Sequence, residues 1–442
     1  MKGSSFHLLT LGCPKNEVDS EAIRSMLENS GFNYEENQDL AELIIINTCT
    51  FIETAIKDSI DAILEVSLRK KKEQSVIIIG CLVQRYPHEL FAELLEVSAF
   101  VGLNDYRKIP EIAAKVLGGE RVFSVSTLKV RDFCFLKERE QNGNRNSYYV
   151  KIADGCSRNC AFCILPKLHG RYISRKIENI ITEVRKLCND NEIEAILIAQ
   201  DTGLYGTDLY EARNLPKLID EISGIDNVRW IRLLYLNPDT IDDALIEEYK
   251  SNPKLLRYID MPIQHASDHI LHMMNRTDMR TDIQSLISRL RKEIPGVVLR
   301  TSVIVGFPGE TDDDFDQLKE FIMVNEFEWA GVFEYSPQDS TSSCKMKQCE
   351  NRLIKQRHSE LSLTQFEIME KKRGKLIGES LELLVEGPSI EHGDMCEARS
   401  YREAPEIDGK IFLRRRRFSN KSFTRAKIVS NEGLDLIAEE FI

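Results

Sequence analysis

Three cysteines in the middle of the chain have the spacing of a metal-cluster site. Cys156, Cys160 and Cys163 follow the pattern C-x3-C-x2-C, directly after a predicted strand. A structural zinc site would need a fourth ligand, for which His169 is the nearest candidate. Three thiolates suit a [4Fe–4S] cluster whose fourth iron has no protein ligand and is open to a substrate or cofactor. The alternative is a thioredoxin-like C-x-x-C pair of Cys160 and Cys163, in which Cys156 would have no role.

Three further cysteines each follow a short β-rich run in the first part of the chain. They are Cys13, Cys49 and Cys81 (the N-terminal trio), and the runs before them are Phe6–Leu11, Leu43–Asn47 and Ser75–Gly80. In a parallel sheet the carboxyl ends of the strands meet at one edge, where doubly wound folds bind their ligands. The three thiols would then stand together and could hold a second iron–sulfur cluster with one open iron. The alternative is that they are ordinary buried cysteines.

Helical patterns alternate with these three strands. They cover Asp19–Asn29, Glu53–Arg69 and Pro87–Glu96. The alternation predicts a doubly wound α/β domain with a parallel sheet over residues 1–125. Residues 126–147 are expected to form a linker, because the stretch 137–147 contains no large apolar side chain apart from the stems of its charged residues.

A second series of six strands follows, again separated by helical patterns. The strands are expected at Tyr148–Ala153, Glu194–Ala199, Arg229–Leu236, Leu256–Met261, Val297–Val305 and Glu328–Tyr335. The helices include Ile177–Cys188, Ile241–Lys250, Thr281–Lys292 and Asp312–Asn325. Six such units over residues 148–375 predict a partial (β/α)6 barrel, short of the eight units of a closed one. The loops after barrel strands carry the chemistry in such folds, and the first of them holds Cys156, Cys160 and Cys163 (the barrel trio).

The last segment, residues 376–442, changes to short strands separated by Gly, Pro, Asp and Asn. Candidate strands are Leu381–Glu386, Met395–Arg399, Lys410–Leu413 and Ala426–Val429. A small all-β barrel of about five strands fits this pattern. Residues 379–442 contain 13 acidic and 10 basic residues, and four of the basic ones form an arginine run at 414–417. The mixed charge suits docking on a basic protein loop, and the arginines would suit a contact with RNA.

The composition is that of a globular protein with an acidic surface. The 442 residues include 59 Lys and Arg against 71 Asp and Glu, which gives a net charge of −12. This balance disfavours nucleic acid as the main partner and favours a basic one. No apolar run approaches the ~20 residues of a membrane span, and the start of the chain shows no export signal. We therefore expect a cytoplasmic protein without a membrane partner, whose 11 cysteines serve metal or redox chemistry rather than disulfides.

Four polar residues in or after the predicted barrel strands have a functional and a structural interpretation. Gln264 and His265 end the fourth strand and could line the barrel cavity. Lys151 and Arg300 lie inside strands and could meet carboxylates of a cofactor or a target. All four could equally be satisfied structural residues of the barrel interior.

The barrel trio, with the aromatic Phe162 before its last cysteine, resembles the signature of the radical S-adenosylmethionine (radical SAM) enzymes. The stretch 301–310, TSVIVGFPGE, is similar to the family's glycine-bearing strand end beside the cofactor. The resemblance implies that the open iron chelates SAM and that an electron from the cluster cleaves SAM into methionine and a 5′-deoxyadenosyl radical. Phe162, Gly306 and Glu310 are then expected to bind the cofactor. Gln200, which closes the second barrel strand, is expected to do the same unless its segment is only a capped turn.

Two three-cysteine sites, the first on a doubly wound domain, resemble the methylthiotransferase family, which inserts a methylthio group into an unactivated C–H bond. The resemblance covers nearly the whole chain. It implies a flavodoxin-like N-terminal domain with an auxiliary [4Fe–4S] cluster on the N-terminal trio, a radical SAM barrel and a C-terminal TRAM β-barrel. The stretches 11–21 (LGCPKNEVDSE), 149–156 (YVKIADGC) and 404–409 (APEIDG) are similar to the branch that acts on small-subunit ribosomal protein twelve. His169, where Arg or Lys is more usual, and the strand end 234–238 depart from that branch.

The resemblance predicts methylthiolation of the β-carbon of an aspartate in ribosomal protein twelve, with two [4Fe–4S] clusters and SAM as cofactors. The partners would be that protein, free or in the ribosome, with a contact to rRNA, an electron donor and a sulfur source. No catalytic residue is predicted beyond the two clusters. Two other functions stay open: a tRNA adenosine methylthiotransferase of the same family, and a non-enzymatic iron–sulfur carrier or redox sensor. A carrier would need neither a radical-type cofactor loop nor a third domain for docking.

Overall fold

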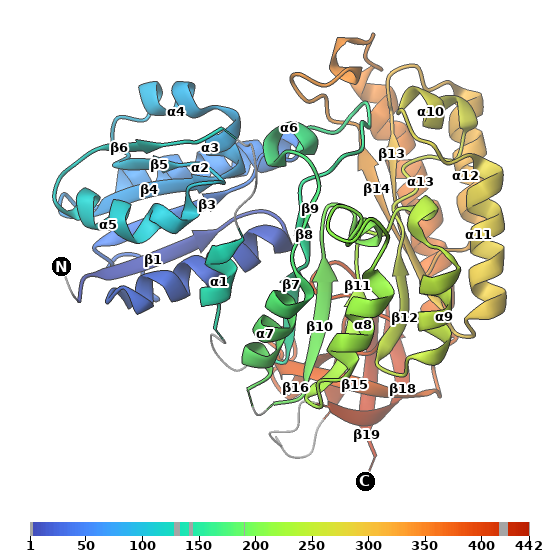
Figure 1. Ribbon diagram of the computed structural model, residues 1–442. Coiled ribbons are helices and arrows are strands. Elements are labelled where there is room, and N and C mark those ends of the chain that lie inside the picture. The colour runs from blue at the N-terminus through green and yellow to red at the C-terminus, as the bar shows by residue number, and fades with distance from the viewer. Residues whose placement is uncertain (1–2, 128–132, 141–144, 190, 415–422, 442) are drawn as a thin grey trace.

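The computed structural model describes residues 3–127, 133–140, 145–189, 191–414 and 423–441. The described residues form two parallel six-stranded sheets, a small closed β-barrel and a short antiparallel pair of strands, β8 (Ala153–Asp154) and β9 (Ile173–Ser174) (Figure 1). The predicted fold class, an α/β domain, a partial α/β barrel and an all-β barrel, is therefore confirmed. Residues 128–132 and 141–144 of the expected linker, and 415–417 of the arginine run, lie outside the described residues. In the described part, none of the helices combines the length and the apolar character that a membrane crossing requires.

The N-terminal sheet has the strand order β2-β1-β3-β4-β5-β6 and is parallel throughout. Its strands are β1 (Ser5–Thr10), β2 (Asn33–Tyr34), β3 (Leu43–Thr48), β4 (Ser75–Gly80), β5 (Ala99–Val101) and β6 (Val122–Ser124). The helices are α1 (Pro14–Asn29), α2 (Glu53–Arg69), α3 (Cys81–Arg85), α4 (Pro87–Glu93) and α5 (Ile109–Leu117). Helices cover both faces of the sheet, so β3 is buried along its whole length. This is the flavodoxin-like order, in which the winding reverses between β1 and β3.

Helix α1 begins at Pro14, whereas the sequence predicted a start at Asp19. Proline is favoured in the first turn of a helix, because its missing N–H needs no partner there and its φ suits the helix. Cys13 is consequently the N-cap residue of α1 instead of a loop residue. Helix α4 also ends early, at Glu93 rather than Glu96, because the chain turns at Leu94 before it enters β5.

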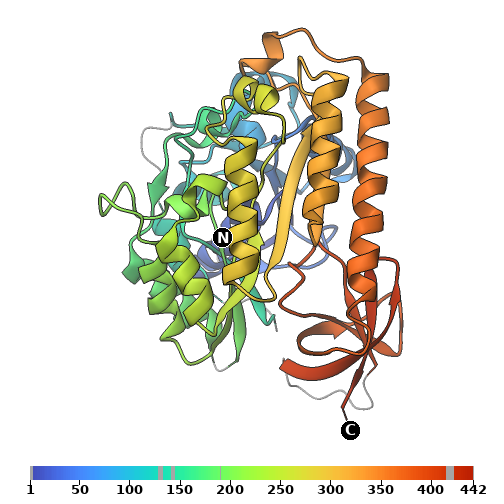
Figure 2. The ribbon, with the colours of Figure 1, turned by 90° about the vertical axis from the view of Figure 1, so that its right-hand side faces the viewer.

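The central sheet is parallel, has the order β14-β13-β12-β11-β10-β7 and stays open, as predicted. Its strands are β7 (Ser147–Lys151), β10 (Ile193–Ile198), β11 (Val228–Leu233), β12 (Leu255–Asp260), β13 (Val298–Val305) and β14 (Trp329–Glu334). Outside it lie α7 (Ile177–Cys188), α8 (Leu215–Ser223), α9 (Asp243–Ser251), α11 (Arg280–Glu293) and α12 (Asp312–Asn325). A further long helix, α13 (Asn351–Gly374), runs beside β14 towards the C-terminal barrel (Figure 2).

Neighbouring residues of the barrel strands point into two different cores, as the two-residue period of a strand requires. Ala195 of β10 packs with the outer helices, whereas Ile196 faces the concave side of the sheet. The concave core also contains Val18 of α1 and Ala404 of the C-terminal part of the chain. The N-terminal domain and the segment around Ala404 therefore close the open barrel from within.

The C-terminal part is a closed five-stranded barrel in the order β15-β16-β17-β19-β18. Its strands are β15 (Ser380–Pro388), β16 (Met395–Arg399), β17 (Ile411–Arg414), β18 (Phe423–Glu432) and β19 (Asp435–Glu440). The loop 400–410 (the insertion loop) leaves this barrel and contacts the central sheet. Its Asp408 accepts a hydrogen bond of 2.6 Å from the hydroxyl of Tyr258 and lies 3.4 Å from Arg300.

Buried ion pairs join the three parts. Glu194 of β10, which is fully buried, pairs with Arg232 of β11 at 2.6 Å and with Arg399 of β16 at 2.7 Å. Burial alone would raise the pKa of Glu194, but the two arginines outweigh it and lower the pKa to about 2. On the other side, the buried Arg139 pairs with Glu21 of α1 and, at 2.8 Å, with Glu183 of α7. Arg139 therefore fastens the N-terminal domain to the barrel.

We expect Arg139→Met to lower the free energy of unfolding by about 3 kcal/mol or more, because it leaves buried carboxylates short of a partner. Arg145→Met is the matched control, since Arg145 also pairs with Glu21 but its side chain is 57% exposed. An exposed pair contributes less than about 1 kcal/mol. Urea denaturation of both variants, followed by circular dichroism, measures the difference. Equal losses in the two variants would contradict the buried role of Arg139.

Candidate functional site

The N-terminal trio lies at the topological switch point of the first sheet. Cys13 follows β1, Cys49 follows β3, and Cys81 opens α3 directly after β4. These three strands are neighbours in the parallel sheet, so the structure places all three cysteines at its carboxyl edge. Doubly wound folds bind ligands at this position.

Close backbone packing brings Cys13 and Cys49 together. Gly12 has φ +96°, and a Cβ at this position would lie 2.5 Å from Cβ and 2.8 Å from Sγ of Cys49. The amide of Asn16 donates to the carbonyls of Leu11 (2.9 Å) and Thr48 (3.1 Å), which ties the end of β1 to the end of β3. Burial raises the pKa of the Cys49 thiol, and the neighbouring Cys13 raises it further.

The barrel trio lies on a loop that begins at Gly155, after the short strand β8 (Ala153–Asp154). Gly155 has φ +80°, and a Cβ there would meet the carbonyl oxygen of Arg171 at 2.1 Å, so only glycine fits this turn. The N–H of Cys156 donates to the carbonyl of Gly170 at 3.1 Å, and the N–H of Cys163 to that of Cys160 at 3.1 Å. The loop is thus folded back on itself.

Arg158 and Ala161 anchor this loop to the barrel. The guanidinium of Arg158 donates to Asp201 at 2.6 Å and, through two nitrogens, to Asp239 at 2.6 and 3.0 Å. The N–H of Ala161 donates to the carbonyl of Met274, which follows α10 (Asp268–Met273), and its carbonyl accepts from Ser343. Loops after four different barrel strands therefore hold the barrel trio in place.

The donor set fits an iron–sulfur cluster. Burial raises the pKa of the Cys163 thiol to about 12, and Cys160 and Cys156 add to the rise, so the three thiols lie within electrostatic range of one another. Within the described residues, no three His, Cys, Asp or Glu side chains converge as ligands of a single ion. A cubane cluster spreads its thiolates over separate irons and needs a wider arrangement than one ion does. Because ligation requires thiolates, cluster binding at either trio releases protons.

The structure brings two of the segments predicted to bind the cofactor into one apolar group. Phe162 of the trio loop packs in the same cluster as Ile304 and Phe307, on either side of Gly306. Gly306 has φ +76°, and a Cβ there would lie 2.4 Å from Ile354 of α13, so this glycine permits the close approach of the helix.

The side chain of Glu310 points back to the backbone of the turn at Gly306. Its Oε2 accepts hydrogen bonds from the N–H groups of Gly306 and, at 3.1 Å, Phe307, and its Oε1 lies 3.2 Å from Arg357. Burial raises the pKa of Glu310 to about 7, although Arg357 and the two amides act in the opposite direction. In this arrangement Glu310 holds the glycine turn, and its expected contact with the cofactor stays a prediction.

A polar chain runs from the N-terminal trio to Asp154, two residues before the first cysteine of the barrel trio. Sγ of Cys81 lies 3.5 Å from Nε2 of His169, the last residue of α6 (Leu165–His169). Nδ1 of His169 lies 2.8 Å from Oδ1 of Asp154, and the same oxygen accepts a 2.6 Å hydrogen bond from the amide of Gln200. Sequence reasoning considered His169 as a metal ligand and as a departure from the pattern of the branch, and it did not single out Asp154. A possible signal was the polar Asp154 at the buried end of an apolar strand, two residues before the first cysteine of the loop.

Three of the four residues with two interpretations have side-chain partners, and Gln264 is paired through its backbone alone, so the role of its side chain in the cavity stays a prediction. Lys151 pairs with Asp19 of α1, and Arg300 pairs with Asp260 at 2.8 Å. Burial lowers the pKa of His265 to about 3, so its ring is neutral, and its Nδ1 accepts from the N–H of Ser267 at 3.0 Å. Gln264 pairs with Val303 in an isolated β-bridge.

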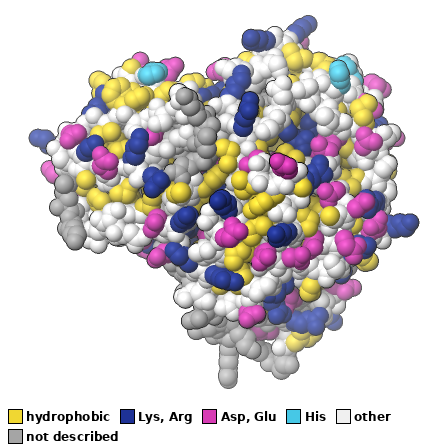
Figure 3. All heavy atoms as spheres, viewed as in Figure 1, with side chains coloured by type: hydrophobic (Ala, Val, Ile, Leu, Met, Phe, Trp, Pro, Cys, Tyr) yellow, Lys and Arg dark blue, Asp and Glu magenta, His cyan; other side chains and the backbone are white. Residues whose placement is uncertain are grey.

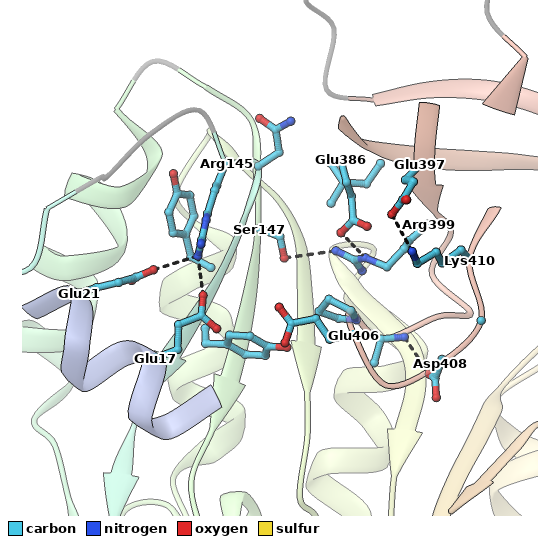
Figure 4. Close-up of a pocket in the computed structure, with 17 residues that line it drawn as sticks. Glu17, Glu21, Arg145, Ser147, Glu386, Glu397, Arg399, Glu406, Asp408 and Lys410 are labelled. Atoms are coloured by element: carbon cyan, nitrogen blue, oxygen red, sulfur yellow. Dashed lines mark hydrogen bonds and ion pairs between the residues drawn. The ribbon is translucent and has the colours of Figure 1, made fainter. Parts of the chain in front are cut away.

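A crevice of about 430 Å³ (the junction crevice) lies where the three parts of the chain meet, and the sequence did not predict it (Figure 4). Helix α1, the start of β7, the C-terminal barrel and the insertion loop all line it. Six carboxylates face three cations in its lining: Glu17, Glu21, Glu386, Glu397, Glu406 and Asp408 against Arg145, Arg399 and Lys410. Because these side chains come from distant segments of the chain, no local sequence pattern predicts that they lie together.

Comparison with known proteins assigns the parts of the chain. A model of the radical SAM superfamily matches residues 150–322, a TRAM domain model matches 377–440, and one described as uncharacterized protein family UPF0004 matches 5–102. Among solved structures, the radical SAM methyltransferase TsrM from Kitasatospora setae is similar with a TM-score of 0.53. The two are 15% identical, and the match covers 76% of this chain and 77% of that one. The half-barrel with its cysteine loop thus has the fold of a radical SAM enzyme.

Two relatives with similar sequences show to which family of radical SAM enzymes the chain belongs. A protein from Thermoanaerobacter sp. (strain X514) is 41% identical over 98% of this chain and 99% of its own length. One from Caldanaerobacter subterraneus subsp. tengcongensis is 43% identical over the same shares. Both are named ribosomal protein uS12 methylthiotransferase RimO. The chain belongs to this RimO family of methylthiotransferases, and the predicted family is confirmed.

We expect Gly12→Ala to destabilise the metal-free protein by about 1–3 kcal/mol more than Gly119→Ala does. Both glycines have positive φ (+96° and +88°), and this strain costs alanine about 1–2 kcal/mol at each position. A Cβ at Gly119 meets nothing within 4 Å, whereas one at Gly12 overlaps Cys49 and adds an overpacking cost. Urea denaturation under reducing conditions compares the two. The same loss in both would mean that Gly12 and Cys49 are not in close contact.

Proposed function

We propose that this protein methylthiolates the β-carbon of an aspartate in ribosomal protein uS12 by radical SAM chemistry. Relatives that match over the full chain carry the name uS12 methylthiotransferase, which supports the activity and the substrate. The observation that carries the proposal is the 3.5 Å contact between Cys81 and His169, because it joins the edge of the first sheet to the cysteine loop of the barrel. A reaction that joins sulfur from one site to a radical made at the other requires the two sites to face each other.

The barrel trio holds one [4Fe–4S] cluster and SAM in this proposal, and the N-terminal trio holds a second cluster. When bound, these groups supply the electron, the 5′-deoxyadenosyl radical, the methyl group and the sulfur of the reaction. Arg158 fixes the barrel loop through Asp201 and Asp239, so the three thiols keep one geometry. Gly12 and Asn16 do the same for the N-terminal trio.

Four residues form the proposed cofactor pocket. Phe162 and the apolar side chains around Gly306 exclude water from the place where a radical would form. Gln200 donates its amide to Asp154, and its carbonyl oxygen has no hydrogen-bond partner among the described residues, so it is available to a bound ligand. Glu310 keeps the glycine turn in shape through Gly306 and Phe307.

The junction crevice is the proposed entrance for the substrate protein. Its lining contains twice as many carboxylates as cations, six against three, and this excess suits a basic polypeptide. The net charge of −12 acts in the same direction at longer range. The proposal includes three further partners. Arg414 would contact rRNA, and the reaction would also need an electron donor and a sulfur source.

The other functions are not favoured. A tRNA-modifying enzyme of this family would meet an acidic crevice and an acidic overall charge, both of which repel a phosphate backbone. A non-enzymatic carrier has no use for the glycine turn around Gly306 or for the half-barrel of a radical SAM enzyme.

The substrate assignment predicts that the anaerobically reconstituted protein, with SAM and a strong reductant, adds one methylthio group to uS12. Under the same conditions we expect no modification of tRNA adenosine. Mass spectrometry of intact uS12 and of nucleosides from digested tRNA measures both products. A comparable rate of tRNA modification would promote the alternative over the proposal.

Substitution of a cysteine should affect the reaction differently in each of the two trios. We expect Cys160→Ala to abolish 5′-deoxyadenosine formation, because a cluster deprived of a thiolate is lost or mis-poised. Cys81→Ala should still form 5′-deoxyadenosine but no methylthiolated uS12, and each variant should retain about half of the iron. Cys188→Ala is the matched control, since Cys188 is buried on α7 outside both trios and should keep the full iron content.

Chromatography of 5′-deoxyadenosine and of modified uS12, with iron analysis, distinguishes the variants. If Cys81→Ala stopped 5′-deoxyadenosine release as completely as Cys160→Ala while the barrel cluster stayed intact by Mössbauer spectroscopy, the division of labour between the trios would be wrong.

A further inference from the structure

Lys15 is a cation without a counter-ion at the interface of the two sites. It is the second residue of α1, two positions after Cys13, and its side chain is half-buried. Its ammonium lies 3.9 Å from the centre of the Tyr235 ring, just beyond the carboxyl end of β11. Within the described residues it forms neither an ion pair nor a hydrogen bond. Lys15 therefore reaches from the N-terminal trio into the concave side of the barrel.

The other cations of this interior all have carboxylate partners. Lys151 pairs with Asp19, and Arg158 pairs with Asp201 at 2.6 Å. Arg300 pairs with Asp260 at 2.8 Å. Each of these charges is therefore balanced within the fold.

The carboxylates near Lys15 are engaged elsewhere. Asp260 binds Arg300 and also accepts the N–H of Tyr235 at 2.9 Å. Asp154 accepts the amide of Gln200 at 2.6 Å and lies 2.8 Å from His169. Among the described residues the ammonium contacts the Tyr235 ring and makes no direct ion pair with either carboxylate. An anionic group of a ligand would complete this site.

The residue beneath Lys15 is strained. Tyr235 has φ +64°, a conformation that costs a bulky residue about 1–3 kcal/mol and persists only where the surrounding structure holds it. Two hydrogen bonds keep its backbone there: its N–H donates to the carboxylate of Asp260, and its carbonyl accepts from the N–H of Thr202 at 3.0 Å. The strained backbone turns the ring under Lys15, so the position of the ammonium is determined by the fold and not by chance contact.

One residue of the junction crevice, Tyr149, belongs to the same core cluster as Tyr235. Burial raises the pKa of Tyr149, and Glu406 and Tyr235 add to the rise, so Tyr149 lies within electrostatic range of both. A peptide segment that entered along the carboxylates of the crevice would therefore reach the Tyr235 ring and the ammonium above it.

We propose that Lys15 binds the side-chain carboxylate of the target aspartate and so selects aspartate over asparagine. This assignment rests on the proposed function, because it takes an aspartate of uS12 as the substrate. The carboxylate is the group that distinguishes aspartate from its amide, and an ammonium without a counter-ion is suited to recognise it. The β-carbon is one bond away from the bound carboxylate, which brings it beside the N-terminal trio that Lys15 adjoins.

The test compares two peptides of the uS12 target loop, with Asp or Asn at the target position, on the protein carrying both clusters. We expect the wild-type protein to bind the Asp peptide at least about tenfold more tightly, as a charged hydrogen bond implies. Lys15→Met should bind both peptides with equal, weak affinity. Lys15→Arg keeps the charge and should keep most of the preference. Fluorescence anisotropy of labelled peptides measures the dissociation constants.

Lys57→Met is the matched control, because Lys57 lies exposed on α2, and it should show the wild-type preference. A Lys15→Met protein that still preferred the Asp peptide would overturn the assignment, and so would loss of iron from its N-terminal trio, which would make Lys15 a counter-charge for the cluster. If the wild-type protein modified uS12 but Lys15→Met discriminated normally, only the role of Lys15 would fail. If the wild-type protein neither bound the Asp peptide nor modified uS12, the proposed function would fail first.

Discussion

The buried ion pair between Lys151 and Asp19 determines where the two cysteine trios lie relative to each other. Lys151 ends β7, three residues before Asp154 and the cysteine loop, and Asp19 lies on the helix that starts at Cys13. Both side chains are almost completely buried, so separating them would leave two charges without water or a partner. The N-terminal domain therefore cannot slide over the barrel without a large cost. The contact between Cys81 and His169 is possible only in this docked position.

The docking also explains why the central barrel can remain open. A half-barrel leaves its concave face open, and here that face carries apolar side chains such as Ile196 together with buried charges such as Glu194. Helix α1 covers part of that face and the insertion loop covers another part, with Asp408 bonded to Tyr258. Glu194 binds one arginine of the barrel and one of the C-terminal barrel, so the third domain has a defined position too. The acidic crevice is what remains between these coverings.

Local patterns in the sequence were sufficient for the central strands and for the grouping of the cysteines, whereas the short strands β5 and β6, the helix α13 and the last strand β19 were not predicted. The six barrel strands and the helices Glu53–Arg69, Ile177–Cys188 and Asp312–Asn325 follow from apolar periodicity, and the structure has them. The N-terminal trio could be inferred because the carboxyl ends of parallel strands share an edge by geometry. The start of α1 was missed because proline suggests a break, although it is favoured in a first turn.

Contacts between distant segments could not be predicted in the same way. Cys81 and His169 are 88 residues apart, and Lys151 and Asp19 are 132 apart. No period or motif connects such positions; only the docking of finished domains does. Glu310 illustrates a related limit, because its type and place suited a cofactor contact while its carboxylate is used by the N–H groups of its own turn.

The protein is acidic overall but has cations in its interior, and this difference is related to what each region binds. The net charge is −12, yet Lys15, Lys151 and Arg300 all lie in the interior near the trios. An iron–sulfur cluster with three thiolates, or a carboxylate of a ligand, brings negative charge into a place of low dielectric constant, where cations lower its cost. On the face seen in Figure 3, acidic and basic side chains are interspersed with apolar ones and form no continuous basic field. The total charge thus bears on the partner that approaches from outside, whereas Lys15 is the interior cation that, among the described residues, has no carboxylate partner and is available to a ligand. A count of charged residues cannot show this difference between surface and interior, because Lys15 is only one of the 59 Lys and Arg residues.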